Sequence, residues 1–372
     1  MKKRKRTSFL IQSLTLSFVG ILSAGLASGQ SGPWGYVRSD GINSVVSLDN
    51  NGHVIEHYLL ADGWHVGDLS AQAGAPRADW RAVPYVRADK INAVVYSNLT
   101  TGHIYELSLS AAGWHYSDLT ANAAAPPGHE PVPHVRSDGI SSVVFLGIQD
   151  EHVYEMYLLS DGWHCGDLTA QTGAPLAWGV PTPYVRSDGT NSIVYIDVNS
   201  KIWELYLSNG TWKAGCLTAI AYAPLASGGQ PLNPYVRSDG ISSVIYQDGN
   251  KDIVELYLFY GNWIYDNLTS QANLPRQLYS EINPYVRSDR TNSIVLRGAD
   301  NHIYELYLQG SWHWADLTSN SGAPTLFQGG HPYVRSNKIN SIVFLDNSGH
   351  IDDIFLGPSG WLWEDLTMLA GG

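Results

Sequence analysis

Residues 184–224 read YVRSDGTNSIVYIDVNSKIWELYLSNGTWKAGCLTAIAYAP, and after about residue 33 the chain repeats this unit seven times. An arginine recurs at Arg38, Arg87, Arg136, Arg186, Arg237, Arg287 and Arg335. A tryptophan recurs at Trp64, Trp114, Trp163, Trp212, Trp263, Trp312 and Trp361. Both series step by 48 to 51 residues, a period that is typical of a solenoid, a propeller or an array.

Each unit contains four short apolar runs, which in the first copy cover residues 36–39, 43–48, 53–59 and 64–69. Asp, Asn and Gly lie between the runs and favour tight turns, so the unit is predicted to form a four-stranded antiparallel meander. We therefore predict that residues 30–372 form an all-β, seven-bladed β-propeller with little helix. A solenoid is the alternative, but it requires polar capping repeats, and the first and last copies are as apolar as the others. The sequence does not decide whether one repeat makes one blade or whether the first strand joins the preceding blade.

Residues 1–29 have the plan of a signal peptide, with a basic start at residues 2–6, an apolar run over 9–26 and small residues at 27–29. Secretion is therefore predicted. A membrane anchor is the alternative, but polar residues dilute the run and no second apolar span follows it, so we expect no membrane insertion. Without those five basic residues the chain has 17 Lys and Arg against 34 Asp and Glu, a net charge of about −17. This charge disfavours nucleic acid or an anionic membrane as a partner.

Cys165 and Cys216 are the only cysteines, and they lie in neighbouring repeats. A disulfide would require their Cα atoms to lie about 6 Å apart. Equivalent strands of stacked units rarely come that close, so we expect two free thiols.

An acid precedes each tryptophan by seven or eight residues, at Glu56, Glu106, Glu155, Glu204, Glu255, Glu305 and Asp353. One interpretation is structural, in which the acid pairs with the arginine 18 or 19 residues earlier. The other is a sugar site between blades, since arginine and glutamate bind vicinal hydroxyls and an aromatic ring packs on the C–H face of a sugar. The tryptophan has the same two interpretations, as a filler between blades or as the stacking ring. Aromatic residues at the end of the second strand are further candidates for the site: Tyr96, Phe145, Tyr195, Tyr246 and Phe344.

Two other polar series carry less information. We expect the turn aspartates to be structural, because each loop offers only one carboxylate to a metal: Asp40, Asp89, Asp138, Asp188, Asp239 and Asp289. One histidine in each of five copies cannot form a zinc site: His53, His103, His152, His302 and His350. No metal or cofactor is therefore predicted.

Catalysis requires groups that converge once, and identical repeats supply equivalent groups instead. Unusual residues occur only in the connections between copies: Trp80, Arg81, His129, Glu130, Trp178, Arg276, Tyr279 and His331. None has the spacing of a catalytic motif. The sequence therefore predicts a protein that is not an enzyme.

Two segments resemble a known family: HIYELYL at residues 302–308 and GWHCGDLTAQTGAP at 162–175. From Trp34 to about Ala370 the repeats resemble the PLL-like and fucose-specific lectin group of β-propellers. The resemblance implies a ring of six or seven blades, no catalysed reaction, and glycan partners bound between blades, with fucosylated or O-methylated sugars as candidates. It carries over the glutamate and the tryptophan. In the fungal fucose lectins the arginine lies twelve residues before the glutamate, a position that Ser44 and Ser293 hold here, so the arginine is not carried over by position.

Together these features predict a secreted, multivalent lectin with candidate sites formed by the repeated Arg, Glu and Trp. We expect the seventh site to be weak, because it has Asp353 and Asn337, and the fourth and fifth sites too, because Cys216 and Asn267 replace an aspartate. A scaffold that binds a protein partner is the first alternative. A carbohydrate-active enzyme with its site at the central channel is the second.

Overall fold

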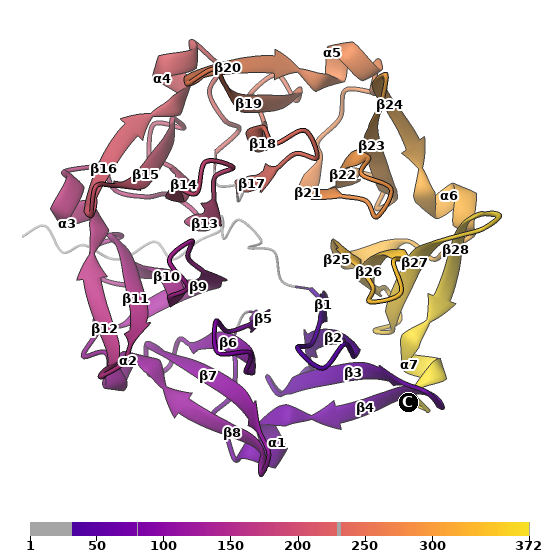
Figure 1. The fold of residues 1–372 in the computed structure, drawn as a ribbon. Helices are drawn as coiled ribbons and strands as arrows, with labels where there is room; N and C mark the ends of the chain where they lie inside the picture. The colour runs from indigo at the N-terminus through magenta and orange to yellow at the C-terminus, as the bar shows by residue number, and fades with distance from the viewer. Residues whose placement is uncertain (1–31, 80, 229–231, 372) are drawn as a thin grey trace, which may run out of the picture.

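The computed structural model describes residues 32–79, 81–228 and 232–371, so the predicted signal peptide lies outside the described residues. These residues form seven four-stranded antiparallel sheets, each built from four consecutive strands. Figure 1 shows the sheets as blades around a central opening, with the first strand of each blade innermost and the fourth at the perimeter. The predicted seven-bladed β-propeller is confirmed.

The strands of the first four blades are as follows. Blade 1 has β1 (Trp34–Val37), β2 (Asn43–Leu48), β3 (Val54–Leu60) and β4 (Gly63–Asp68); blade 2 has β5 (Ala82–Val86), β6 (Asn92–Asn98), β7 (His103–Ser110) and β8 (Gly113–Asp118). Blade 3 has β9 (Gly128–Val135), β10 (Ser141–Gly147), β11 (Val153–Leu159) and β12 (Gly162–Asp167); blade 4 has β13 (Thr182–Val185), β14 (Asn191–Ile196), β15 (Ile202–Ser208) and β16 (Thr211–Cys216).

The other three blades have the same plan. Blade 5 has β17 (Asn233–Val236), β18 (Ser242–Gln247), β19 (Ile253–Phe259) and β20 (Asn262–Asn267); blade 6 has β21 (Ser280–Val286), β22 (Asn292–Arg297), β23 (Ile303–Gln309) and β24 (Ser311–Asp316). Blade 7 has β25 (Leu326–Val334), β26 (Asn340–Asp346), β27 (Ile351–Gly357) and β28 (Gly360–Asp365).

One short helix follows each fourth strand: α1 (Leu69–Ala73), α2 (Leu119–Asn122), α3 (Leu168–Thr172), α4 (Leu217–Ala221), α5 (Leu268–Ala272), α6 (Leu317–Ser321) and α7 (Leu366–Leu369). In blade 1 the side chain of Asp68 accepts a hydrogen bond from the backbone N–H of Ala71 and caps the helix. The fourth strand therefore ends at Asp68, and Leu69, which was expected in the strand, begins the helix. The repeated Asp-Leu-Thr sequence is a helix-capping signal.

The core lies between the blades. The second strands are buried on both faces, so Val45 and Val46 are both inaccessible to solvent although they point to opposite sides of the sheet. Each apolar cluster therefore contains residues from two neighbouring blades. For example, Val45 and Trp64 of blade 1 pack with Tyr333 and Val343 of blade 7.

The ring closes by the same contact that joins every other pair of blades. At each junction a backbone N–H after the arginine donates to a side chain at the start of the next blade's second strand. The pairs are Ser39 with Asn92, Ala88 with Ser141, Ser137 with Asn191, Ser187 with Ser242, Ser238 with Asn292, Ser288 with Asn340 and Ser336 with Asn43. The last pair joins blade 7 to blade 1, which lie side by side in Figure 1. One repeat thus makes one blade, and the alternative with an exchanged first strand is wrong.

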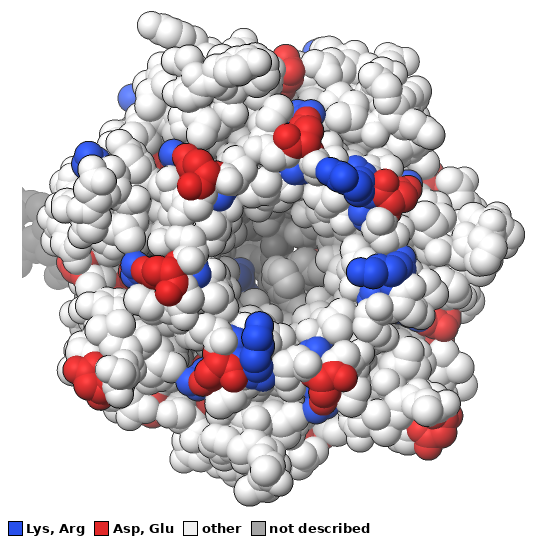
Figure 2. Space-filling model, in the orientation of Figure 1, with Lys and Arg blue, Asp and Glu red and all other residues white. Residues whose placement is uncertain are grey.

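Charged side chains gather around the central opening, where Figure 2 shows acidic beside basic residues in a circle. The rest of this face carries few charged groups. Among the described residues, no helix is long and apolar enough to cross a membrane.

Candidate functional site

The repeated arginine and acid form an ion pair in every blade. In four blades the closest nitrogen to oxygen distances are 3.9 Å for Arg38 and Glu56, 3.1 Å for Arg87 and Glu106, 3.6 Å for Arg136 and Glu155, and 3.5 Å for Arg237 and Glu255. Nε lies 2.8 Å from the carboxylate for Arg186 and Glu204 and 2.9 Å for Arg287 and Glu305, and in both pairs a terminal nitrogen of the arginine also contacts the glutamate. Arg335 pairs with Asp353 in blade 7. The predicted structural pairing is therefore confirmed, which leaves the question of what else the pair can do.

The glutamates are already satisfied within their own blades. They are at most 1 % exposed. The hydroxyl groups of Tyr85 and Ser243 donate to Glu106 and Glu255, both at 2.7 Å. Burial raises the pKa of both glutamates, and the nearby arginine opposes this shift. In blade 2 the carboxylate of Glu106 thus links Arg87 to Tyr85 of the first strand.

The tryptophan that completes each site comes from the following blade. We name a junction by its two blades, so that junction 5/6 lies between blades 5 and 6. At this junction a cleft of about 560 Å³ is lined by Arg237 and Glu255 of blade 5 and by Trp312 of blade 6. A second cleft of about 300 Å³ at junction 3/4 is lined by Arg136, Glu155 and Trp212. The three groups thus meet between blades, as predicted, but they come from two copies of the repeat.

The remaining lining of the cleft at junction 5/6 gives it a mixed polar and apolar wall. Tyr257, Phe259 and Ile264 supply apolar surface from blade 5, whereas Asp266 and Gln271 supply hydrogen-bonding groups. Burial and a hydrogen bond with Asp266 raise the pKa of Tyr257 to about 12, so its hydroxyl is protonated at neutral pH. A cleft of this size with few polar groups between aromatic walls is typical of a small-molecule site.

Sequence reasoning missed three of these positions. The tyrosine two residues after the glutamate was quoted as part of a motif but not as a site residue, although positions two apart on a strand share one face. Tyr157 and Tyr257 hold this position in the two clefts. The isoleucine four residues after the arginine also lines both clefts, as Ile140 and Ile241, and Gln171 and Gln271 contribute from the helices.

The arginine adopts one arrangement in blades 1, 2, 3 and 5. There it bridges the buried glutamate and the exposed turn aspartate, which it contacts at 2.7–2.9 Å: Arg38 with Asp40, Arg87 with Asp89, Arg136 with Asp138 and Arg237 with Asp239. Nε of these four arginines is buried and has no hydrogen-bond partner within the described residues. The guanidinium is therefore drawn toward the turn. The turn aspartate has the predicted structural role, since Asp239 also accepts from the N–H of Ile241 at 3.3 Å.

Blades 4 and 6 show a second arrangement. Arg186 donates from Nε and from a terminal nitrogen to Glu204, and its guanidinium lies 5.3 Å from the ring centre of Tyr206 and 5.5 Å from that of Trp263. Arg287 does the same with Glu305, at 5.3 Å from Tyr307 and 5.4 Å from Trp361. The cation thus lies close to two aromatic rings from neighbouring blades.

In blade 7 the arginine also lies close to two aromatic rings. Arg335 lies 5.3 Å from the ring centre of Phe355 and 5.7 Å from that of Trp64. It pairs with Asp353 and with Glu364, and its side chain is only 7 % exposed. Arg335 thus occupies the corresponding position at junction 7/1.

The aromatic residues at the end of the second strand do not belong to the site. Tyr96, Phe145, Tyr195, Tyr246 and Phe344 are at most 2 % exposed and lie in the core. The tyrosine hydroxyls of three of them donate at 2.8–2.9 Å to the carbonyls of Pro76, Pro175 and Pro224 in the preceding connection. The suggestion that these rings contribute to sugar binding is wrong, because both faces of the second strand are buried.

The five recurrent histidines pair with the aspartates that cap the helices. Their Nδ1 atoms lie 2.7–2.9 Å from the carboxylates in His53 with Asp68, His103 with Asp118, His152 with Asp167, His302 with Asp316 and His350 with Asp365. In the described part of the chain no group of three or more His, Cys, Asp or Glu could hold a metal ion. Both cysteines are free.

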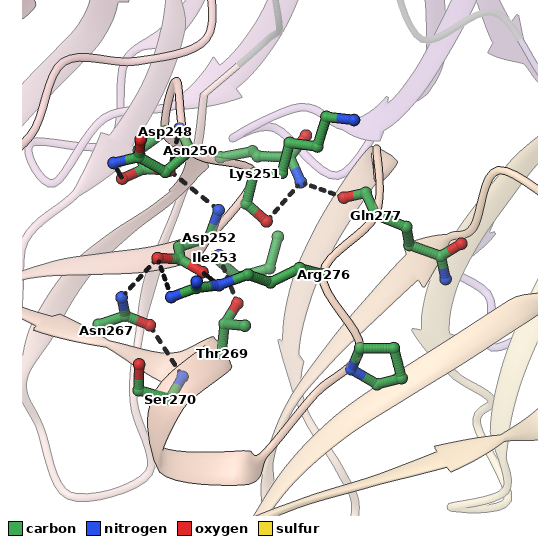
Figure 3. A network of polar contacts seen from close by, with 12 residues as sticks. Asp248, Asn250, Lys251, Asp252, Ile253, Asn267, Thr269, Ser270, Arg276 and Gln277 are labelled. Atoms are coloured by element: carbon green, nitrogen blue, oxygen red, sulfur yellow. Dashed lines mark hydrogen bonds and ion pairs between the residues drawn. The ribbon is translucent and has the colours of Figure 1, made fainter.

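Blade 5 replaces this pair with a different network. Asp252 takes the place of the histidine, and Asn267 donates to it at 2.9 Å while capping the helix through Ser270. Arg276 reaches in from the connection after α5 and contacts both oxygens of Asp252, at 2.7 and 3.1 Å (Figure 3). Asn267 does not line the cleft at junction 5/6, so this replacement leaves the cleft unchanged. Asn267 thus gives no structural reason for a weak fifth site, whose affinity stays a prediction.

Three of the unusual connection residues, Arg81, Glu130 and His331, lie at buried contacts between blades. Arg81 pairs with Glu130 at 3.3 Å, and its guanidinium lies 5.8 Å from the ring centre of Trp34. Trp34 stacks on His331 at 3.7 Å between ring centres, and Nδ1 of His331 lies 2.9 Å from the carbonyl oxygen of Pro33. Burial lowers the pKa of His331 to about 3, so it is neutral and packs blade 7 against blade 1. Trp80 lies outside the described residues.

Comparisons with known proteins point to the same architecture. No family model and no curated relative matches the chain. A solved structure, the BP39L lectin from Burkholderia pseudomallei, superposes with a TM-score of 0.68 at 12% identity, over 90% of this chain and 98% of that one. The two chains share one fold.

Two fungal structures are more distant in shape. The Aleuria aurantia lectin, described as a six-bladed β-propeller with a novel mode of fucose recognition, has a TM-score of 0.50 at 15% identity and covers 91% of this chain and 95% of that one. AofleA from Arthrobotrys oligospora also has a TM-score of 0.50, at 14% identity, over 78% of this chain and 86% of that one. Similarity at these identities establishes the fold, and the predicted resemblance is confirmed at that level.

Proposed function

We propose that this protein is a secreted, multivalent and non-catalytic lectin that binds glycans at the junctions between blades. The observation that carries the proposal is the cleft at junction 5/6, where Arg237, Tyr257 and Asp266 lie opposite Trp312. Guanidinium and carboxylate groups hydrogen-bond to vicinal hydroxyls, and an indole ring packs on the C–H face of a sugar. The lectins with the same fold support a glycan as the ligand.

The ring geometry favours weak individual sites that act together. Because the junctions repeat around one rigid ring, several sites can engage a surface that is dense in glycan, and the overall affinity exceeds that of one site by orders of magnitude. The predicted signal peptide and the acidic mature chain fit an extracellular partner of this kind. Terminal fucose is the first candidate sugar, because the Aleuria aurantia lectin is described by its fucose recognition.

A glycan array probed with the chain from residue 30 onward tests the proposal directly. Binding to a defined set of glycans supports it. No binding to any glycan would contradict it and favour a scaffold for a protein partner.

The number of sites is then measured by titration calorimetry with methyl α-L-fucoside, or with the terminal sugar of the best array ligand. Trp312→Ala removes the stacking ring at junction 5/6 and is expected to lower the number of sites by one. Trp178→Ala is the matched control, because Trp178 is half exposed and does not line the clefts described above. An equal effect of both substitutions would place the sugar elsewhere.

A further inference from the structure

The two arrangements of the arginine follow one position in the repeat. The four blades in which the arginine contacts the turn aspartate have isoleucine four residues after it: Ile42, Ile91, Ile140 and Ile241. The two blades in which the arginine turns back onto the glutamate have Thr190 and Thr291 at that position. The arrangement thus changes with the residue type and not with the order of the blades.

Competition for the turn aspartate explains the correlation. The N–H of Thr190 donates to Asp188 at 2.9 Å, and the threonine hydroxyl adds a second hydrogen bond that helps to lower the pKa of this aspartate. In the isoleucine blades the same N–H contact is longer, at 3.2–3.3 Å. An exposed ion pair contributes little free energy, so one competing hydrogen bond is enough to release the arginine. Within the described residues, Arg186 makes no ion pair with Asp188.

In the threonine blades the guanidinium, which no longer contacts the turn aspartate, makes several other contacts. At junctions 4/5 and 6/7 it forms a two-bond pair with a buried glutamate and lies between two aromatic rings. At junctions 3/4 and 5/6 the corresponding space is part of an open cleft, and the isoleucine lines it. The arginine of a threonine blade therefore fills the place that a sugar ring would take.

We propose that this residue, isoleucine or threonine, sets which junctions of the ring accept a sugar. Junctions 1/2, 2/3, 3/4 and 5/6 are open to ligand. Junctions 4/5 and 6/7 are filled by their own arginines, and junction 7/1 is filled by Arg335, since Asn337 replaces the turn aspartate there. The binding part of this inference rests on the proposed function, and it assigns four sites to the ring.

Exchanging the residue types tests the proposal. With methyl α-L-fucoside as the probe, calorimetry is expected to give four sites for the parent chain and six for the double variant Thr190→Ile/Thr291→Ile. Ile241→Thr is expected to give three. Ile339→Thr is the matched control and leaves four, because Asn337 offers no carboxylate for the new threonine and Arg335 fills that junction already. Seven sites in the parent, or four in every variant that melts like the parent, would overturn the proposal.

A crystal structure of Thr190→Ile separates this inference from the proposed function, because it requires no sugar. The expected result is Arg186 within 3 Å or so of Asp188 and away from Trp263, as its counterparts in the isoleucine blades are. If Arg186 still lies between Tyr206 and Trp263 in this variant, the proposed role of the isoleucine or threonine is refuted, even if the protein binds glycans. If the arginine moves and no sugar binds, the isoleucine or threonine does control the arrangement of the arginine, and the lectin proposal fails.

Discussion

The backbone N–H of Ser336 donates a hydrogen bond to Oδ1 of Asn43 at 2.7 Å, and this contact joins the last blade to the first. The same bond joins Ser137 to Asn191 at 2.8 Å between blades 3 and 4, which the chain also links covalently. Asn43 and Asn191 are both about 5 % exposed, whereas Ser336 and Ser137 are exposed, so both bonds are shielded from water to a similar, partial extent. The contact that closes the ring therefore has an equivalent between blades 3 and 4, against which its contribution to stability can be measured.

We expect Asn43→Ala to lower the free energy of unfolding by about 0.5–1.5 kcal/mol, because it removes the partly buried hydrogen bond from the N–H of Ser336. Asn191→Ala is the control and should cost a similar amount. Urea denaturation followed by tryptophan fluorescence measures both. An open ring in solution would show a loss for Asn191→Ala and none for Asn43→Ala.

Helix α4 lacks the cap that other blades have. Cys216 holds the capping position, but its side chain contacts only the hydroxyl of Thr218, at 3.5 Å, and accepts no capping hydrogen bond from a backbone N–H of the helix. In blade 3, by contrast, Asp167 accepts from the N–H of Ala170 at 2.8 Å. We expect Cys216→Asp to raise the free energy of unfolding by about 1 kcal/mol, since capping aspartates contribute this much. Cys216→Ala separates the cap from the loss of the thiol. Equal stability of the Asp and Ala variants in urea would contradict the prediction.

The buried carboxyl group of Glu281 is expected to make the free energy of unfolding depend on pH. Burial raises its pKa to about 8, although Arg297 donates to it at 3.2 Å. Between about pH 4.5 and 8 the folded chain holds a proton that the unfolded chain has lost, so the contribution of Glu281 to stability falls as the pH rises through this range.

Glu281→Gln removes this titration. The free energy of unfolding of the variant, relative to that of the parent at the same pH, should therefore rise by about 4 kcal/mol from pH 5 to pH 9. The reason is that a difference of one bound proton changes the free energy of unfolding by about 1.4 kcal/mol for each step of one in pH. Melting temperatures across this range provide the measurement. Glu151→Gln is the control, since the side chain of Glu151 is half exposed. A pH-independent difference between Glu281→Gln and the parent would show that Glu281 ionises normally in the folded protein.

Cys165 should be unreactive while the protein is folded. Burial, with the nearby charges of Asp167 and Glu155, raises the pKa of its thiol to about 12, and only the thiolate reacts with alkylating reagents. At pH 8 we expect iodoacetamide to modify Cys165 at least ten times more slowly in the native protein than in urea, as measured by peptide mass spectrometry. Rapid native labelling would mean that blade 3 opens locally.

The fold followed from the sequence because a period near 49 residues with four apolar runs allows few architectures. The pairing of arginine with glutamate also followed, since both lie in one copy. The origin of the tryptophan could not be predicted, because spacing within a repeat carries no information on which neighbour a side chain faces. Trp312 belongs to the sixth copy but lines the cleft of Arg237 in the fifth.

Other details depend on contacts between distant residues. Asp252 stands at the position of the recurrent histidine and pairs with Arg276 from 24 positions away, and no pattern in the repeat indicates this pairing. Tyr96 and its counterparts had the composition of a sugar site, but burial on both faces of the second strand places them in the core. The arrangement of each arginine depends on one hydrogen bond in a turn, which only atomic geometry reveals.

Because every blade consists of one whole repeat, a chain with a copy added or deleted would leave no strand without its sheet. Recombination between equivalent positions of two repeats could then add or remove one blade at a time. Each junction between blades would keep its hydrogen bond. A duplicated isoleucine repeat would add a binding position, whereas a duplicated threonine repeat would enlarge the ring without one. The valency of such a molecule can therefore evolve separately from its size.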